Sequence, residues 1–169
     1  MVHRSFGRRY KMKIKGITDE DFVNYKYPSM FIATSTCSFK CEKECGIEGM
    51  CQNHPLATAP SIEFPDDWII KRFLYNDISK AVVCGGLEPF DQFEELFQLI
   101  SKFRAQTLVD IVIFTGYTEQ EVFQKIQLLS RFTNIVIKYG RYIPNQKPHY
   151  DEVLGIELAS NNQYAKRIS

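Results

Sequence analysis

Residues 81–89 read Ala-Val-Val-Cys-Gly-Gly-Leu-Glu-Pro, a short apolar run that ends in two glycines and an acid. Three further runs are equally short and rich in β-branched or aromatic residues: Met30–Thr34, Ile111–Thr115 and Asn134–Lys138. Continuous apolar runs of this length are typical of strands that are buried on both faces of a parallel sheet. The sequence therefore predicts four parallel strands, including one over Ala81–Cys84.

Amphipathic segments separate these runs and predict helices. Pro65 followed by Asp66 and Asp67 predicts a helix start, because proline suits the first turn and acids suit the positive end of the helix dipole. A second helix is indicated by apolar residues at helical spacing, namely Phe93, Leu96, Phe97, Ile100 and Phe103. Thr118 and Glu121 form a capping box before a third helix. The buried face of this third helix is predicted to comprise Val122, Ile126 and Leu129.

The alternation of strands and helices predicts one α/β domain with right-handed crossovers. Eight strand–helix units do not fit into 169 residues. We therefore expect a minimal partial (β/α) barrel or an open parallel sheet of about four to six strands. Residues 1–28 are interpreted as a basic N-terminal extension and lead-in, and residues 29–169 as a single domain. The tail from residue 142 onwards is expected to form loops that pack on the sheet.

Composition excludes several classes of protein. The chain has 21 basic and 20 acidic residues, a net charge of +1 and 44% hydrophobic residues, which is typical of a globular fold. Without a strong charge, no nucleic-acid or membrane partner is expected. No run of about 18 apolar residues is present, so no membrane span is predicted. The basic start, Met1–Gly16, lacks the apolar stretch of a signal peptide, and we therefore expect a cytoplasmic protein with reduced thiols.

Four of the five cysteines lie in one short segment directly after the first predicted strand: Cys37, Cys41, Cys45 and Cys51. The gaps between them are three, three and five residues, whereas structural zinc usually uses cysteine pairs separated by two. Polar neighbours argue against a chance cluster of core cysteines. An iron–sulfur cluster is the favoured interpretation, since thiolates are its standard ligands, and zinc remains the alternative. Cys84, inside a predicted strand, is interpreted as a small buried hydrophobe.

A second group of candidate residues follows the strand at Ala81–Cys84. Gly85 and Gly86 would let a ligand approach the backbone closely. Glu88 could accept a charge-assisted hydrogen bond from a ligand ammonium group. Ligands of α/β proteins gather at the carboxyl ends of the strands, where both groups of residues are expected. The alternative is an ordinary strand–helix turn with an acid at the helix start.

Together these two segments resemble the radical S-adenosylmethionine (SAM) superfamily, in the same order and topology. Cys37-Ser-Phe-Lys-Cys41 is similar to the first half of its CxxxCxxC motif, and the Gly-Gly-Leu-Glu-Pro segment is similar to its Gly-Gly-Glu-Pro motif. The resemblance implies a [4Fe–4S] cluster held by three cysteines. It also implies that the amino and carboxylate groups of SAM chelate the fourth iron, and that Gly85, Gly86 and Glu88 hold the methionine end.

Two departures from the family pattern concern Leu87 and the third cysteine. Leu87 is inserted between the glycines and the glutamate. Either Cys45 or Cys51 could be the third cluster ligand. Cys51 is preferred because it is followed by Gln52-Asn53, and Gln-Asn or His-Asn often follows the third ligand in the family; Asn53 is accordingly counted among the cofactor-binding residues. The cysteine that is not used would be a spare thiol or a fourth ligand.

Later segments resemble the activating proteins of anaerobic ribonucleoside-triphosphate reductases, which are glycyl-radical-enzyme activases. The similar segments are Phe114–Thr118, Ile137–Tyr142 and Leu158–Gln163, with Tyr139 where an aspartate is usual. The resemblance implies cleavage of SAM to a 5′-deoxyadenosyl radical, which abstracts hydrogen from a glycine of a partner reductase. It also implies an external electron donor of the flavodoxin or ferredoxin type. Two alternatives stay open: a radical SAM enzyme acting on another peptide or small molecule, and a noncatalytic iron–sulfur or zinc module.

Overall fold

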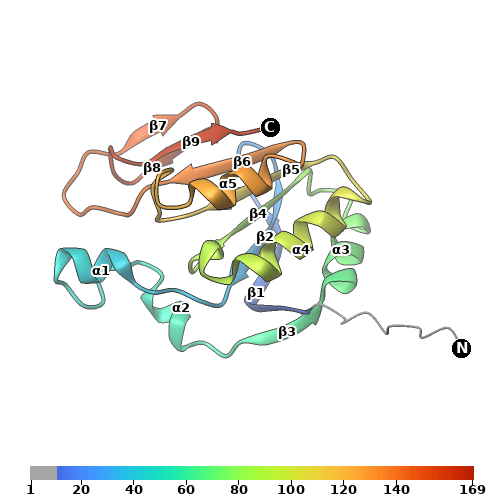
Figure 1. Ribbon diagram of the computed structural model, residues 1–169, viewed down its shortest axis with the longest axis horizontal. Helices are drawn as coiled ribbons and strands as arrows, with labels where there is room; N and C mark the ends of the chain where they lie inside the picture. The colour runs from blue at the N-terminus through green and yellow to red at the C-terminus, as the bar shows by residue number, and fades with distance from the viewer. Residues whose placement is uncertain (1–10) are drawn as a thin grey trace, which may run out of the picture.

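The computed structural model describes residues 11–169, and Figure 1 shows a main sheet with helices packed against it. The predicted basic extension therefore lies in part, at residues 1–10, outside the described residues. The sheet has seven strands in the order β3-β1-β2-β4-β5-β6-β9. A separate two-stranded sheet is formed by β7 and β8.

The four predicted strands form the centre of this sheet. They are β2 (Ser29–Thr34), β4 (Ala81–Gly86), β5 (Asp110–Phe114) and β6 (Ile135–Tyr139). β2 pairs with β4, β4 with β5 and β5 with β6, all in parallel. Their side chains are buried on both faces, which explains why the sequence shows continuous apolar runs here. The predicted α/β class is confirmed.

The edges of the sheet differ from the expectation of a parallel sheet with about four to six strands. β1 (Lys11–Asp21) and β3 (Ile62–Pro65) extend one edge, and β9 (Tyr164–Arg167) extends the other, all three in antiparallel pairing. The sheet is therefore mixed and has seven strands. β1 lies within residues 1–28, and its pairing with β2 makes Lys11–Asp21 part of the sheet.

The tail is more ordered than the predicted loops. β7 (His149–Asp151) and β8 (Ile156–Leu158) form an antiparallel hairpin before the chain returns to the main sheet as β9. These strands have three or four residues each, which is too short for a strand pattern to stand out in the sequence. The prediction of loops in this region is corrected accordingly.

Three helices follow the strands as predicted and cover one face of the sheet (Figure 1): α3 (Asp66–Leu74), α4 (Phe93–Arg104) and α5 (Phe123–Leu129). The capping box before α5 is present, since the Thr118 amide donates to Glu121 Oε2 (2.9 Å) and the Glu121 amide to Thr118 Oγ1 (3.3 Å). Two short helices, α1 (Lys40–Cys45) and α2 (His54–Thr58), belong to the cysteine segment. None of the helices between residues 11 and 169 has the length and apolar character needed to cross a bilayer.

The other face of the sheet is covered only over part of its area. Tyr25, from the loop between β1 and β2, packs with Leu154 and Leu158 over the central strands. The Tyr25 hydroxyl donates to Asp110 Oδ2 (2.9 Å), and Arg167 Nη1 donates to Asp110 Oδ1 (2.8 Å). These contacts close the amino-terminal end of this face, so that a cavity remains at the carboxyl ends of the strands.

Candidate functional site

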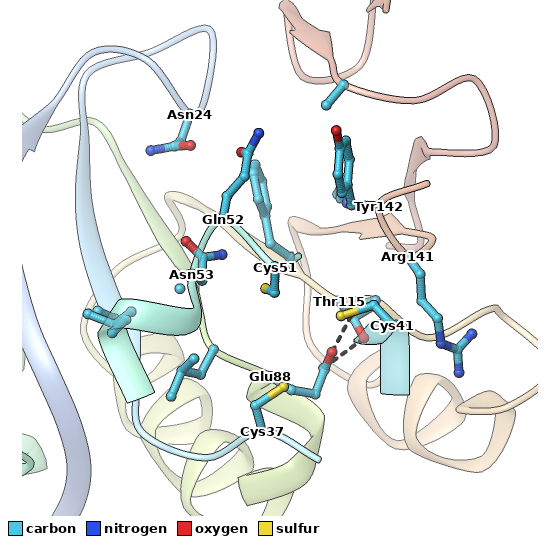
Figure 2. A pocket seen from close by; sticks show the side chains of 18 of the residues that line it. Asn24, Cys37, Cys41, Cys51, Gln52, Asn53, Glu88, Thr115, Arg141 and Tyr142 are labelled. Atoms are coloured by element: carbon cyan, nitrogen blue, oxygen red, sulfur yellow. Dashed lines mark hydrogen bonds between the residues drawn. The ribbon is translucent and has the colours of Figure 1, made fainter. Parts of the chain in front are cut away.

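A cavity of about 730 Å³ lies at the carboxyl ends of β2, β4, β5 and β6. This volume is within the range of cavities that bind small molecules and cofactors. Both groups of candidate residues line it, since Cys37, Cys41 and Cys51 form one side and Gly86 and Glu88 another. Figure 2 shows the three cysteine side chains around one space beside Glu88.

The cysteine segment is folded onto itself by a buried carboxylate. Glu42, next to Cys41 on α1, accepts hydrogen bonds at Oε1 from the Cys51 amide (3.1 Å) and from His54 Nδ1 (2.9 Å). Its side chain is 8% exposed. Because one carboxylate holds both ends of the segment, Cys51 lies close to Cys41 although ten positions separate them in the chain.

Cys45, the other candidate ligand, does not line this cavity. Cys45, at the last residue of α1, is exposed and lines a smaller neighbouring cavity of about 390 Å³. Cys41 lines both cavities. The structure thus brings together Cys37, Cys41 and Cys51 and leaves Cys45 outside. Cys84 is fully buried in β4, as predicted.

Two thiols of this group, those of Cys37 and Cys41, are protonated without a metal. Burial raises the pKa of Cys37 to about 11. Burial, followed by the neighbouring Cys51 thiol, raises the pKa of Cys41 to about 11 as well. Metal ions bind the thiolate, so loading of this site must release protons.

The donor set of this cavity consists of three thiols that face one space. Zinc and an iron–sulfur cluster both bind cysteine thiolates, and in a cluster each cysteine binds a different iron. Three thiols around a common space therefore suit a [4Fe–4S] cluster with three cysteine ligands.

Glu88 is held at the base of the cavity by two residues that directly follow β5 and by a backbone amide from its own turn. Its Oε1 accepts from Thr115 Oγ1 (2.7 Å) and from the Phe90 amide (3.1 Å), and its Oε2 accepts from the Gly116 amide (2.8 Å). Burial raises the pKa of Glu88 to about 7, and these hydrogen bonds oppose the effect. An ionised carboxylate has about four acceptor positions, so Oε2 can accept one more donor from the cavity.

Packing explains why Gly85 and Gly86 carry no side chain, which the sequence alone does not show. A Cβ on Gly85 would lie 3.3 Å from the side chains of Phe31 and Phe114. A Cβ on Gly86, whose φ is +85°, would lie 2.9 Å from Leu56 Cδ2. Leu56 belongs to α2, shortly after Cys51, so the absence of a side chain at Gly86 lets the end of the cysteine segment pack on β4. The inserted Leu87 is buried and lines the cavity.

Backbone and side-chain hydrogen bonds join the cysteine segment to the Gly-Gly-Leu-Glu segment. The Glu88 amide donates to Thr36 O (2.8 Å). Asp91 accepts from the Ser38 amide (2.7 Å) and from the Tyr117 hydroxyl (2.5 Å), and so links the cysteine segment to the end of β5. The position of Cys37 is thus fixed by contacts that need no metal.

Ion pairs fix α1 from the opposite side. Glu121 accepts from Lys40 Nζ (2.9 Å) and Arg141 Nη2 (2.6 Å), and Arg141 Nε lies 3.3 Å from Glu44. Lys40 and Arg141 both lie over the ring of Tyr117, at 5.3 and 5.6 Å from its centroid.

The segments that resemble the activating proteins also meet at the cavities. Gly116, Tyr117, Gly140, Arg141 and Gln163 line the large cavity. Asn53 and Gln52 lie beside Cys51 (Figure 2) and line it too. Tyr139 and Asn162 face the smaller cavity instead.

Lys138 is a residue of the site that sequence reasoning missed. It lies at the end of β6, is 9% exposed and lines the large cavity. Its Nζ donates to Gly140 O (3.1 Å), and burial lowers its pKa to about 8. The signal was a charged residue inside an otherwise apolar strand, Ile-Val-Ile-Lys-Tyr.

Comparison with known proteins gives one match. No curated protein and no solved structure matches the chain. The family model described as 4Fe-4S single cluster domain matches residues 29–164, which include the three cysteines of the cavity, Glu88 and Lys138. Because the match covers most of the chain, this protein belongs to the 4Fe-4S single cluster domain family.

Proposed function

We propose that the protein is a radical SAM enzyme that cleaves SAM reductively beside a [4Fe–4S] cluster. The observation that carries this proposal is that Cys37, Cys41, Cys51 and Glu88 line one cavity large enough for a nucleoside-sized ligand. Membership of an iron–sulfur family supports the cluster, and the resemblance of the sequence motifs supports SAM.

Cys37, Cys41 and Cys51 are the proposed cluster ligands. Three cysteines for four irons leave one iron without a protein ligand, and that iron would face the cavity. Cys45 would bind no iron, because it is exposed and lines the neighbouring cavity. A zinc module is the alternative, and the match to an iron–sulfur family favours the cluster.

Glu88, Gly86 and Asn53 are the proposed contacts to the methionine end of SAM. The free acceptor position on Glu88 Oε2 suits an ammonium group. Gly86 exposes its backbone at the cavity wall, and Asn53 lies beside Cys51. Gly85 would act indirectly, because a Cβ at this position would crowd Phe31 and Phe114, which line the cavity.

The cluster and SAM would supply the chemistry. One electron from a flavodoxin- or ferredoxin-type donor would break a carbon–sulfur bond of the sulfonium, with methionine and a 5′-deoxyadenosyl radical as products. The chain's own work is to bind, orient and shield. The aromatic rings of Phe31 and Phe114 and the side chains of Leu56 and Leu87 give the cavity apolar walls that limit water. Thiols that must stay reduced agree with a cytoplasmic location.

The proposed substrate is a glycine of a partner protein, such as an anaerobic ribonucleotide reductase. The cavity is open to solvent, and a reactive radical needs a site closed to water. A docking protein would supply that closure, and Tyr117 and Arg141, which line the cavity and are partly exposed, are the proposed contacts. Gln163 is buried and would not be reached. A different peptide or a small molecule is the alternative substrate.

Anaerobic reconstitution with iron and sulfide tests the proposal. The expected product is brown protein with about four irons per chain that releases 5′-deoxyadenosine from SAM in the presence of a reductant. Adding an anaerobic reductase should then give a stable glycyl-radical signal in electron paramagnetic resonance. Colourless protein with one tightly bound zinc contradicts the cluster. A cluster without SAM cleavage leaves a noncatalytic iron–sulfur module, and SAM cleavage without a glycyl radical favours another substrate.

A further inference from the structure

Cys45 is the cysteine of the segment after β2 that the proposed cluster does not use. Of the five cysteines it alone is exposed, whereas Cys37, Cys41 and Cys51 are partly buried and Cys84 is buried. It nevertheless lies near the cluster site, because it follows Cys41 by four residues on α1. Residues four apart on a helix share one face, with their Cβ atoms about 5–6 Å apart. An exposed thiol is thus one helical turn away from a proposed cluster ligand.

The smaller cavity, of about 390 Å³, connects this thiol with the cluster site. Cys41 and Cys45 both line it, and Cys41 lines the large cavity as well. Two buried polar atoms of its lining residues, Tyr139 Oη and Asn162 Oδ1, have no hydrogen-bond partner within residues 11–169. The Tyr139 side chain is completely buried. A buried polar atom without a partner is costly, so these two atoms indicate that a further polar group enters this cavity.

A persulfide on Cys45 has the properties that this cavity requires. A tyrosine hydroxyl can donate to a sulfur anion, and an amide oxygen can accept from a protonated sulfur. The added sulfur–sulfur bond, about 2 Å long, can carry the outer sulfur by that length toward Cys41. A disulfide between Cys41 and Cys45 is disfavoured, because disulfide Cβ atoms are about 3.5–4.5 Å apart, closer than those of residues four apart on a helix.

Cluster assembly needs such a thiol, because the inorganic sulfide of the cluster has to be delivered to a site whose own cysteines bind iron. A donor that placed its sulfur on Cys37, Cys41 or Cys51 would block a thiol that the iron needs. Exchange between thiols and sulfur–sulfur bonds also depends on access, which favours the exposed cysteine. We propose that Cys45 accepts sulfur from a persulfide-bearing donor and passes it to the cluster site. This sulfur relay goes beyond the proposed function, because it concerns assembly and does not depend on SAM cleavage.

The relay consists of two balanced steps. In the first, the Cys45 thiolate attacks the outer sulfur of the donor persulfide; a new sulfur–sulfur bond forms, the old one breaks, and the donor leaves as a thiol. In the second, two low-molecular-weight thiols, such as glutathione, supply two electrons. They are oxidised to one disulfide, the outer sulfur leaves as hydrogen sulfide, and Cys45 returns to the thiol form. The sulfide is released in the smaller cavity, beside Cys41.

Two routes of cluster assembly on three metal-free proteins test the relay. One route supplies ferrous iron, glutathione, free cysteine and a cysteine desulfurase, an enzyme that carries a persulfide. The other supplies ferrous iron and sodium sulfide. The proteins are the wild type, Cys45→Ser and the double variant Cys45→Ser/Glu48→Cys. Position 48 is exposed and does not line the smaller cavity, so the double variant keeps an exposed thiol in the segment but at the wrong place.

The rise of iron–sulfur absorbance is followed anaerobically, and mass spectrometry of samples without glutathione locates any added sulfur. With the desulfurase, Cys45→Ser and the double variant should assemble the cluster about tenfold more slowly than the wild type, because the accessible acceptor is missing or misplaced. With sodium sulfide, the three rates should agree within about twofold, and each protein should reach about four irons per chain. The first added sulfur atom of the wild type should be on Cys45.

Four results would overturn the relay. Equal desulfurase rates for the wild type and Cys45→Ser would mean that sulfur is not passed on through Cys45. A full rate in the double variant would mean that any exposed thiol suffices. Slower assembly from both sulfur sources would give Cys45 a structural or ligand role. Sulfur found first on a different cysteine would move the acceptor elsewhere. A wild type that stays colourless with both sources refutes the cluster and the relay together, whereas a relay that works in a protein without SAM cleavage refutes only the proposed enzyme.

Discussion

Replacing Glu88 with glutamine separates its structural role from its proposed ligand role. Glutamine keeps the shape of the side chain but has one acceptor and one donor where the carboxylate has two acceptors. If the glutamine oxygen takes the place of Oε1, near Phe90 and Thr115, the glutamine NH2 group faces the backbone amide of Gly116. If the side chain is flipped, the NH2 group faces the backbone amide of Phe90 instead. In both orientations one buried backbone N–H is left without an acceptor.

The expected loss of stability follows from that one lost acceptor. An unsatisfied buried donor costs about 1–3 kcal/mol. For a chain of this size, 1 kcal/mol corresponds to roughly 2–4 °C in melting temperature, so Glu88→Gln should lower the melting temperature by roughly 2–12 °C. Glu88→Ala leaves three donors without acceptors and should lower it further. The exposed Glu94→Gln is the matched control, with an expected change within about 0.5 kcal/mol.

Thermal unfolding of the anaerobically reconstituted proteins, followed by circular dichroism at pH 8, measures the first effect. At that pH Glu88 is mostly ionised, since its pKa is about 7. SAM affinity measured on the same samples should fall about ten- to a hundredfold in Glu88→Gln, while about four irons per chain remain. An unchanged melting temperature would refute the hydrogen-bond network, and an unchanged SAM affinity would refute the ligand role.

Three further predictions follow from the same contacts. Cys51→Ser should abolish the iron–sulfur absorbance whereas Cys45→Ser should keep it; the reverse result would show that the exposed thiol is the ligand. Gly86→Ala should lower both iron content and melting temperature, because its Cβ meets a leucine of α2 at 2.9 Å, whereas Gly16→Ala, with no atom within 4 Å of its Cβ, is the control. Asp110 is partly buried, which alone raises its pKa, but its arginine and tyrosine partners lower the pKa overall. Its contribution to stability should therefore be complete above about pH 4 and be lost as the pH falls below that, and Asp110→Asn should flatten this part of the stability–pH curve.

The central strands and helices could be predicted because local pattern and tertiary environment agree there. Strands such as β5 are buried on both faces, and their apolar runs are unambiguous. β1 was missed because only Met12 and Ile14 are fully buried, with Lys13 between them and further lysines on either side, so that the segment resembles a basic extension. The strands of the tail are too short for a period to be visible. β9 in addition pairs with β6, a strand well before it in the chain, and no local pattern encodes that contact.

Most of the candidate residues singled out in the sequence line one cavity, but the sequence does not show what holds them there. Spacing alone leaves Cys45 and Cys51 as competitors, and only the following Gln52-Asn53 favours Cys51. The structure distinguishes them through Glu42, a residue that looks like an ordinary polar neighbour in the sequence but is buried between the two halves of the segment. Lys138 was likewise visible only as an irregularity of an apolar strand. Both are buried charged groups, and their meaning depends on which distant groups face them.

The contacts of the cysteine segment bear on how readily the site takes up a cluster. The segment is held by Glu42, by Asp91 and by the packing of Leu56 on Gly86, and none of these contacts involves a metal. Ordering a flexible segment costs conformational entropy, so a segment that is already held loses less of it when its thiols bind iron. Disrupting Glu42 should therefore lower the iron content of the reconstituted protein before it affects the sheet below.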